Sequence, residues 1–107
     1  MSSRREKIEE MLKDEPSDVF LRYGLAVEYD NEERYEESLA LFMGLTKDTP
    51  PHVPSFFRSA QLLARLDRIH EAWALLRDGI EAARSQDNSH AAAEMGEFLA
   101  SLGSLGE

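Results

Sequence analysis

The sequence predicts an all-α protein in which about six helices form a stack of antiparallel pairs. Apolar residues recur at spacings of three and four, the helical period, and no segment alternates apolar and polar residues as a half-buried strand does. Proline and glycine are sparse, and the connections between the expected helices are short. Neighbouring helices should therefore pack antiparallel. The apolar pattern also returns after a constant offset along the chain, which takes Tyr35 to Ile69 and Phe42 to Leu76.

Local signals place the helices in order along the chain. Pro16 precedes a helix that begins near Asp18, and the Pro50–Pro51 pair precedes one that begins near Val53. Asn88 can cap the start of the last helix. We therefore expect helices over residues 3–14, 18–31, 34–48, 53–66, 68–85 and 89–102.

One offset links three separate segments. Each matched residue lies on one face of its helix, and a chance match of unrelated amphipathic helices would not keep a single offset. The pattern therefore predicts structural repeats. The pairs, each 34 residues apart, are Ile8 with Phe42, Met11 with Leu45, Ala26 with Ala60, Tyr29 with Leu63, Tyr35 with Ile69, Ser38 with Ala72, Leu39 with Trp73, Phe42 with Leu76 and Leu45 with Gly79.

A period of about 34 residues that carries two helices is typical of the tetratricopeptide repeat, or TPR. The chain resembles this family over most of its length. The residues that carry the resemblance are Leu25, Ala26, Tyr29, Tyr35, Ser38, Phe42 and Pro50 in the first full repeat, and Phe56, Ala60, Leu63 and Ala72, with Ile69 and Leu76 more loosely, in the second.

The resemblance implies a single TPR-like domain over residues 1–107, built as a solenoid of helix pairs. A half-repeat helix at 3–14 precedes a first repeat at 18–50 and a second at 53–85, and a capping helix follows at 89–103. Four positions depart from the family pattern. Arg22 replaces a bulky apolar residue, Glu33 and Asp67 replace the turn glycine, and Arg84 replaces the closing proline.

The resemblance also implies a binding surface, because TPR proteins usually bind partners on the concave face lined by the first helix of each pair. Aromatic rings supply contact area and polar groups fix orientation, which suits an extended or helical peptide. An alternative interpretation is that the aromatic rings of Phe20, Tyr23 and Phe57 only cover the core or touch a cap helix. Carried over by position, the concave residues are Phe20, Tyr23, Val27, Asp30, Asn31, Phe57, Arg58, Gln61 and Arg65.

One TPR subclass grips a carboxyl-terminal carboxylate with two lysines, two asparagines and an arginine. The corresponding positions here are Tyr23, Val27, Arg58, His90 and Glu94, and none of them matches. Glu94 carries a charge of the wrong sign and would repel the ligand. We therefore do not expect a clamp of this type.

Composition excludes several classes of partner and chemistry. Twenty-one acidic residues against twelve basic ones give a net charge of −9, so most of the surface repels nucleic acid and anionic membranes. The absence of cysteine excludes disulfides, thiolate nucleophiles and sulfur-ligated metals. The sequence has neither a signal peptide nor an apolar run of about 18 residues, and we therefore expect a cytoplasmic protein.

No catalytic or metal-binding pattern is present, and we expect no cofactor. His52, His70 and His90 are too far apart to share one helix face, and no HExxH spacing occurs. Adjacent acidic residues such as Glu36 and Glu37 point apart on a helix and form a solvated face. A triad can still assemble in space, but a short, shallow array leaves little room for a deep polar pocket. We expect no enzyme.

The function we expect is that of an adaptor or scaffold that binds a protein or peptide partner on the concave face, with the acidic surface favouring a partner that is basic overall. The alternative is a self-assembling structural protein, such as a homodimer, that associates through its terminal helices. The contact residues of that alternative are Met95, Phe98, Leu99 and Leu102, which would otherwise fold back and seal the core.

Overall fold

A computed structural model, which describes residues 3–103, confirms the all-α prediction. These residues form six helices and no strand, and each helix begins and ends close to its predicted bounds. The helices are α1 (Arg4–Asp14), α2 (Val19–Asn31), α3 (Tyr35–Thr46), α4 (Val53–Arg65), α5 (Ile69–Ser85) and α6 (Ser89–Gly103).

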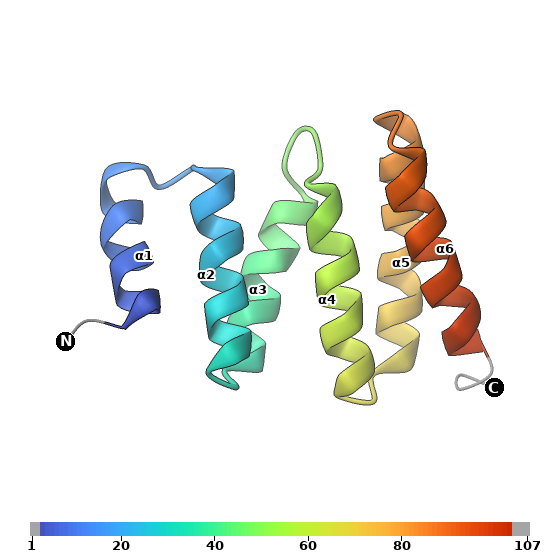
Figure 1. The fold of residues 1–107 in the computed structure, drawn as a ribbon, viewed down its shortest axis with the longest axis horizontal. Coiled ribbons are helices and arrows are strands. Elements are labelled where there is room, and N and C mark those ends of the chain that lie inside the picture. The colour runs from blue at the N-terminus through green and yellow to red at the C-terminus, as the bar shows by residue number, and fades with distance from the viewer. Residues whose placement is uncertain (1–2, 104–107) are drawn as a thin grey trace.

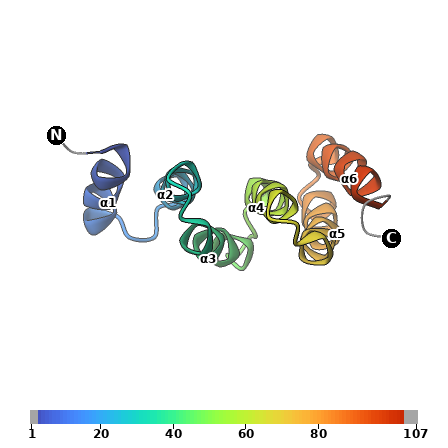
Figure 2. The same cartoon turned by 90° about the horizontal axis from the view of Figure 1, so that it is seen from below.

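The helices stand side by side in chain order, and each runs antiparallel to the next (Figure 1). Nearly all packing is between consecutive helices, and the molecule measures 45 × 30 × 18 Å. Figure 2 shows α2, α4 and α6 along one side of the stack and α3 and α5 along the other. The row of α2, α4 and α6 is bowed inward at α4, so these three helices line the concave side.

Three helices, α2, α4 and α5, end in the same turn, although none of the three turns contains glycine. Glu33, Asp67 and Asp87 adopt left-handed backbone conformations, with φ of 62°, 61° and 57°. This is the conformation that usually favours glycine at a helix end, so Glu33 and Asp67 keep the geometry of the residue they replace. The N–H groups of Arg34, Arg68 and Asn88 donate to the carbonyls of Tyr29, Leu63 and Ala83, each at 2.8 Å.

Small residues occupy the points where paired helices meet. Ala26 and Ser38 are fully buried between α2 and α3, and the Ser38 hydroxyl donates a 2.6 Å hydrogen bond to the Ala26 carbonyl. Ala60 and Ala72 are buried in the equivalent place between α4 and α5. Because a small side chain separates the two backbones at each point, the helix axes can approach closely.

Gly79 marks the closest approach, where α5 passes between α4 and α6. A β-carbon at this position would lie 2.6 Å from the Phe56 β-carbon and 2.7 Å from the Met95 sulfur. The sulfur could rotate away, but a β-carbon is fixed to its backbone. Only glycine therefore fits this crossing.

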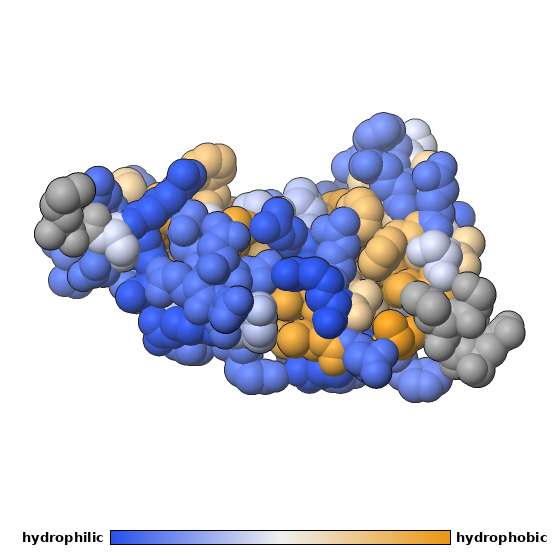
Figure 3. Space-filling model, turned by 60° about the horizontal axis from the view of Figure 1, so that its bottom comes forward, coloured by the Kyte–Doolittle hydropathy of each residue, from blue (hydrophilic) through white to orange (hydrophobic). Residues whose placement is uncertain are grey.

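Helix α1 docks differently, because it has no buried residue. Figure 3 shows the N-terminal part of the molecule, on the left of the view, as a largely hydrophilic surface. Met11 is 50% exposed, although the repeat offset matches it with Leu45, which is fully buried. The difference arises because α1 packs against α2 alone, whereas α3 packs between α2 and α4.

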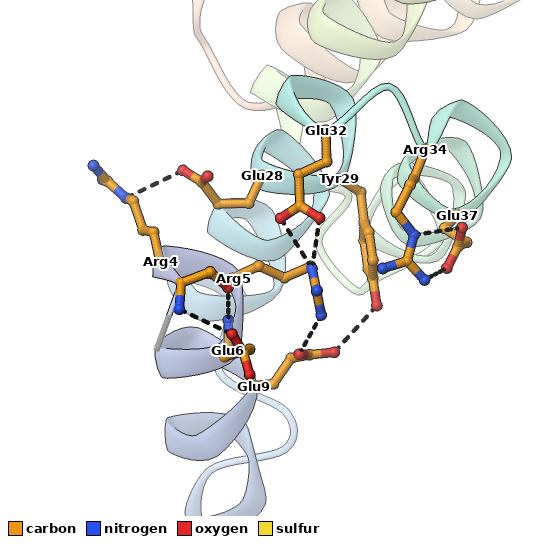
Figure 4. Close-up of polar contacts among 10 residues, drawn as sticks. Arg4, Arg5, Glu6, Glu9, Glu28, Tyr29, Glu32, Arg34 and Glu37 are labelled. Atoms are coloured by element: carbon orange, nitrogen blue, oxygen red, sulfur yellow. Dashed lines mark hydrogen bonds and ion pairs between the residues drawn. The ribbon is translucent and has the colours of Figure 1, made fainter. Parts of the chain in front are cut away.

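Ion pairs hold α1 against α2, and one of their carboxylates, that of Glu9, also contacts Tyr29 (Figure 4). The Arg5 guanidinium lies 3.0 Å from the carboxylate of Glu32 at the end of α2 and 2.7 Å from that of Glu9 on its own helix. Glu9 also accepts a 3.2 Å hydrogen bond from the Tyr29 hydroxyl. Arg4 pairs with Glu28 at 3.1 Å. Ion pairs therefore contribute to the attachment of α1, beside the half-buried side chains of Ile8 and Leu12.

We predict that Gly79→Ala lowers the free energy of unfolding by about 1–3 kcal/mol, because the added methyl group overpacks the crossing of α4, α5 and α6. The matched control is Gly96→Ala on α6, where a β-carbon meets nothing within 4 Å. That change should raise stability by up to about 1 kcal/mol through helix propensity. Chemical denaturation of both variants measures the two effects, and a stable Gly79→Ala variant would contradict the close approach.

We also predict that α1 detaches from α2 at high salt before the rest of the stack unfolds. At about 1 M salt the screening length falls to roughly 3 Å, and the ion pairs of α1 weaken. Hydrogen exchange should then quicken in residues 4–14 but not in α4 or α5. Arg5→Gln should give the same result at low salt. Lys7→Gln should not, because Lys7 is exposed and forms no ion pair with the rest of the described chain.

Candidate functional site

The concave side carries two neighbouring cavities, of about 890 and 360 Å³. Arg58 and Gln61 of α4 line both, so the two cavities meet at these side chains. Seven of the nine residues expected on the concave face line one cavity or both, and Phe20 and Val27 line neither. The seven are Tyr23, Asp30, Asn31, Phe57, Arg58, Gln61 and Arg65. That these side chains contact a partner stays a prediction.

Two of the predicted contact residues already bind each other. The Asp30 carboxylate on α2 lies 2.7 Å from the Arg65 guanidinium on α4, and its side chain is only 5% exposed. Its second oxygen, Oδ1, is buried with no hydrogen-bond partner in the described part of the chain. Asp30 therefore links α2 to α4 and holds Arg65, whose own side chain is 58% exposed, against the larger cavity.

The predicted aromatic contacts serve both the core and the smaller cavity. The Tyr23 ring packs edge-on against Phe42 and His52, with ring centroids 5.7 and 5.1 Å apart. The centroid of the Phe57 ring lies 5.8 Å from that of the Phe98 ring on α6. Tyr23 and Phe57 are half-buried, so they leave part of each ring facing the smaller cavity. Phe20, by contrast, is 83% exposed.

Helix α6 forms one wall of the site. The nine concave residues expected from the sequence include none from this helix. Phe98, Ser101 and Leu102 line the larger cavity, and His90 and Glu94 line the smaller one. The available signal was the position of this helix in the chain: it follows the second full repeat at 53–85, so it takes the place of a first helix, and first helices line the concave side.

The residues of α6 expected to mediate self-assembly mostly face the protein's own core. Met95 is fully buried and Leu102 is 3% exposed. Phe98 and Leu99 are half-buried and pack against the same core cluster. Met95 and Leu102 are therefore buried within the stack, whereas Phe98 and Leu99 keep exposed parts. That this helix seals the core rather than mediates self-association stays a prediction.

Arg22, which replaces an apolar residue of the family pattern, makes an ion pair at the edge of the concave side. Its guanidinium binds both oxygens of the Asp48 carboxylate, at 2.8 and 3.1 Å, and this hydrogen bonding lowers the pKa of Asp48. The pair joins α2 to the loop after α3. The departure from the family pattern thus exchanges an apolar contact for a charged one.

His52 supports the wall of the smaller cavity through Tyr23. Partial burial lowers the pKa of His52 below its usual value, although the nearby Asp48 carboxylate acts in the opposite direction. Its Nδ1 atom lies 2.7 Å from the hydroxyl of Ser55, which is fully buried. Burial therefore favours the neutral imidazole, which packs edge-on against Tyr23.

Metal-binding and membrane-spanning features are both missing from residues 3–103. This part of the chain contains no group of three or more histidine, aspartate or glutamate side chains placed to hold a metal ion. None of its helices combines the length and the apolar character that crossing a membrane requires.

Solved structures similar to this chain include two solution structures. The solution NMR structure of a tetratricopeptide repeat domain protein from Salinibacter ruber is 31% identical in sequence, with 81% of this chain and 88% of that chain covered and a TM-score of 0.76. The solution structure of a protein from Bordetella parapertussis has a TM-score of 0.80 over 96% of this chain and 90% of that chain. Its sequence identity of 22% makes this a likeness of fold alone. No protein-family model matches the chain, and neither does any curated protein.

We predict that His52 makes stability depend on pH. Because the pKa is lower in the folded state, the unfolded chain binds the proton more tightly. The contribution of His52 is complete above the unfolded pKa of about 6.5 and is lost as the pH falls below it. His52→Gln should therefore lose less stability than the wild type between about pH 7 and 5. The matched control is Gln61→His, an exposed position on α4, compared with the wild type for general effects of substitution. Denaturant melts at several pH values measure this, and equal pH slopes in all three proteins would contradict it.

Proposed function

The chain belongs to the tetratricopeptide repeat family, and on that premise we propose that it is an adaptor that binds a peptide segment of another protein on the concave side formed by α2, α4 and α6. The fold is typically a non-catalytic repeat module that mediates protein–protein interaction. We propose that this chain, too, acts by binding and has no chemistry of its own.

One observation supports this proposal most strongly: the two cavities adjoin at Arg58 and Gln61 and form one continuous site along the concave side. The site combines half-buried aromatic rings, Tyr23 and Phe57, with exposed amide groups, Asn31 and Gln61. Aromatic rings give a bound segment apolar contact area, and amide groups can bond to its backbone. Figure 3 shows apolar surface gathered over the C-terminal part of the molecule, which is where α4 and α6 lie.

Charge favours some partners over others. The net charge of −9 attracts a protein that is basic overall and repels nucleic acid, mainly by changing the rate of association. Self-association through α6 is the weaker candidate, because Met95 and Leu102 are buried within the chain itself.

The test is a selection of binders from a library of short random peptides, followed by affinity measurements on the recovered peptides. Gln61→Trp places a large ring where the two cavities meet and should abolish binding, because Gln61 is exposed and lines both. Ala74→Trp adds the same ring at an exposed position of α5, on the opposite side of the stack, and should leave the affinity unchanged.

Both variants should keep the thermal stability of the wild type within the range usual for surface substitutions, about 0.5 kcal/mol. Failure to recover any peptide, or equal binding by the two tryptophan variants, would show that the concave side is not the binding surface.

A further inference from the structure

We infer that Arg58 binds the carboxylate of an acidic side chain within the partner's peptide, beside an apolar side chain of that peptide in the smaller cavity. This inference rests on the proposed function and adds a specificity to it. The partner segment would then carry an aspartate or glutamate next to an apolar residue, although the partner as a whole is basic.

Arg58 lacks the carboxylate partner that the other half-buried arginines have. Four other arginines of residues 3–103 are half-buried, and each forms an ion pair with a carboxylate. Arg58 is half-buried and has no hydrogen bond or ion pair within the same residues, in a chain that holds twenty-one acidic residues. The four pairs are Arg5 with Glu32, Arg22 with Asp48, Arg34 with Glu37 and Arg68 with Glu71.

No carboxylate of residues 3–103 that lines the two cavities pairs with Arg58. Of the acidic residues that line the two cavities, Asp30 binds Arg65, and Glu94 lies 3.3 Å from the His90 imidazole. Glu33 is exposed in the turn after α2. The site thus offers a positive group that its own acids leave free.

The chemistry of the guanidinium selects the ligand. Arginine has five N–H donors in a planar fork, no acceptor, and a charge that persists at every physiological pH. A carboxylate fits this fork with two parallel hydrogen bonds, which are shorter and stronger than bonds to a neutral acceptor. Half-burial strengthens the preference, because the guanidinium is partly removed from water that would otherwise compete.

The position of Arg58 distinguishes an internal side chain from a chain end. Because Arg58 lines both cavities, a peptide lying along the concave side passes it and continues in both directions. A terminal carboxylate bound at Arg58 would leave one of the two cavities empty. The acid is therefore a side chain within the segment.

The smaller cavity identifies the neighbouring residue. Its walls include Tyr23, Val53, Phe57 and Met95, and its volume of about 360 Å³ is ample for one large apolar side chain. A ring or a branched aliphatic group placed there would contact the exposed parts of Tyr23 and Phe57. An acidic residue beside an apolar one is thus the pattern that the site complements.

The experiment measures the affinity of peptides recovered from the random library, synthesised with both ends blocked. We expect an acidic residue in the recovered peptides. Replacement of that acid by its amide, and Arg58→Gln in the protein, should each weaken binding by about tenfold or more, and the two changes together should add little further. Arg77→Gln makes the same change at an exposed arginine of α5 that forms no ion pair within residues 3–103, and it should have no effect.

Circular dichroism checks that Arg58→Gln is folded, and the amide change in the peptide tests the same contact on the wild-type protein in any case. Peptides that bind in a Gln61-dependent way but tolerate Arg58→Gln and carry no required acid would overturn this inference and leave the proposed function standing. Binding that needs a free carboxyl terminus would also overturn it. If no peptide is recovered, both proposals fail together.

Discussion

The stack depends on close contact between helix backbones at positions where the side chain is small. Ala26 against Ser38, and Ala60 against Ala72, set the distance within each helix pair, and Gly79 sets it where α5 meets both neighbours. Because the same contact recurs at the repeat offset, each pair is placed on the last in a similar way. The inward bow of α2, α4 and α6 follows from that repetition, and the two cavities lie along it.

Local signals in the sequence were sufficient to predict the helices and their order. Periodicity and capping act within a few residues, so the predicted bounds hold even where the expected turn residue is missing, as at Glu33 and Asp67. The small residues were equally visible because they share one offset. Met11 is the exception. The 34-residue offset identifies its position in a repeat, but it does not show whether the helix that carries Met11 has a neighbouring helix on each side.

The site was predictable as a surface but not as a set of interactions. Position within the repeat placed seven side chains around the cavities. It did not indicate that Asp30 holds Arg65, because that pair joins two different helices and depends on distances fixed by packing. For the same reason, position within the repeat could not distinguish Arg58 from Arg65. The structure separates them: Arg65 has a carboxylate partner and Arg58 has none within the described residues.

The proposed function implies that electrostatics acts on a partner at two scales. The net charge of −9 creates a field that salt screens over about 8–10 Å, and it guides a basic protein toward the surface without selecting a sequence. The bond to Arg58 acts only at contact, in a partly desolvated site, where geometry decides which group can bind. A basic protein with an acid at one position satisfies both, because the long-range attraction depends on total charge and the contact depends on a single carboxylate. Affinity and selectivity can thus arise from charges of opposite sign on the same partner.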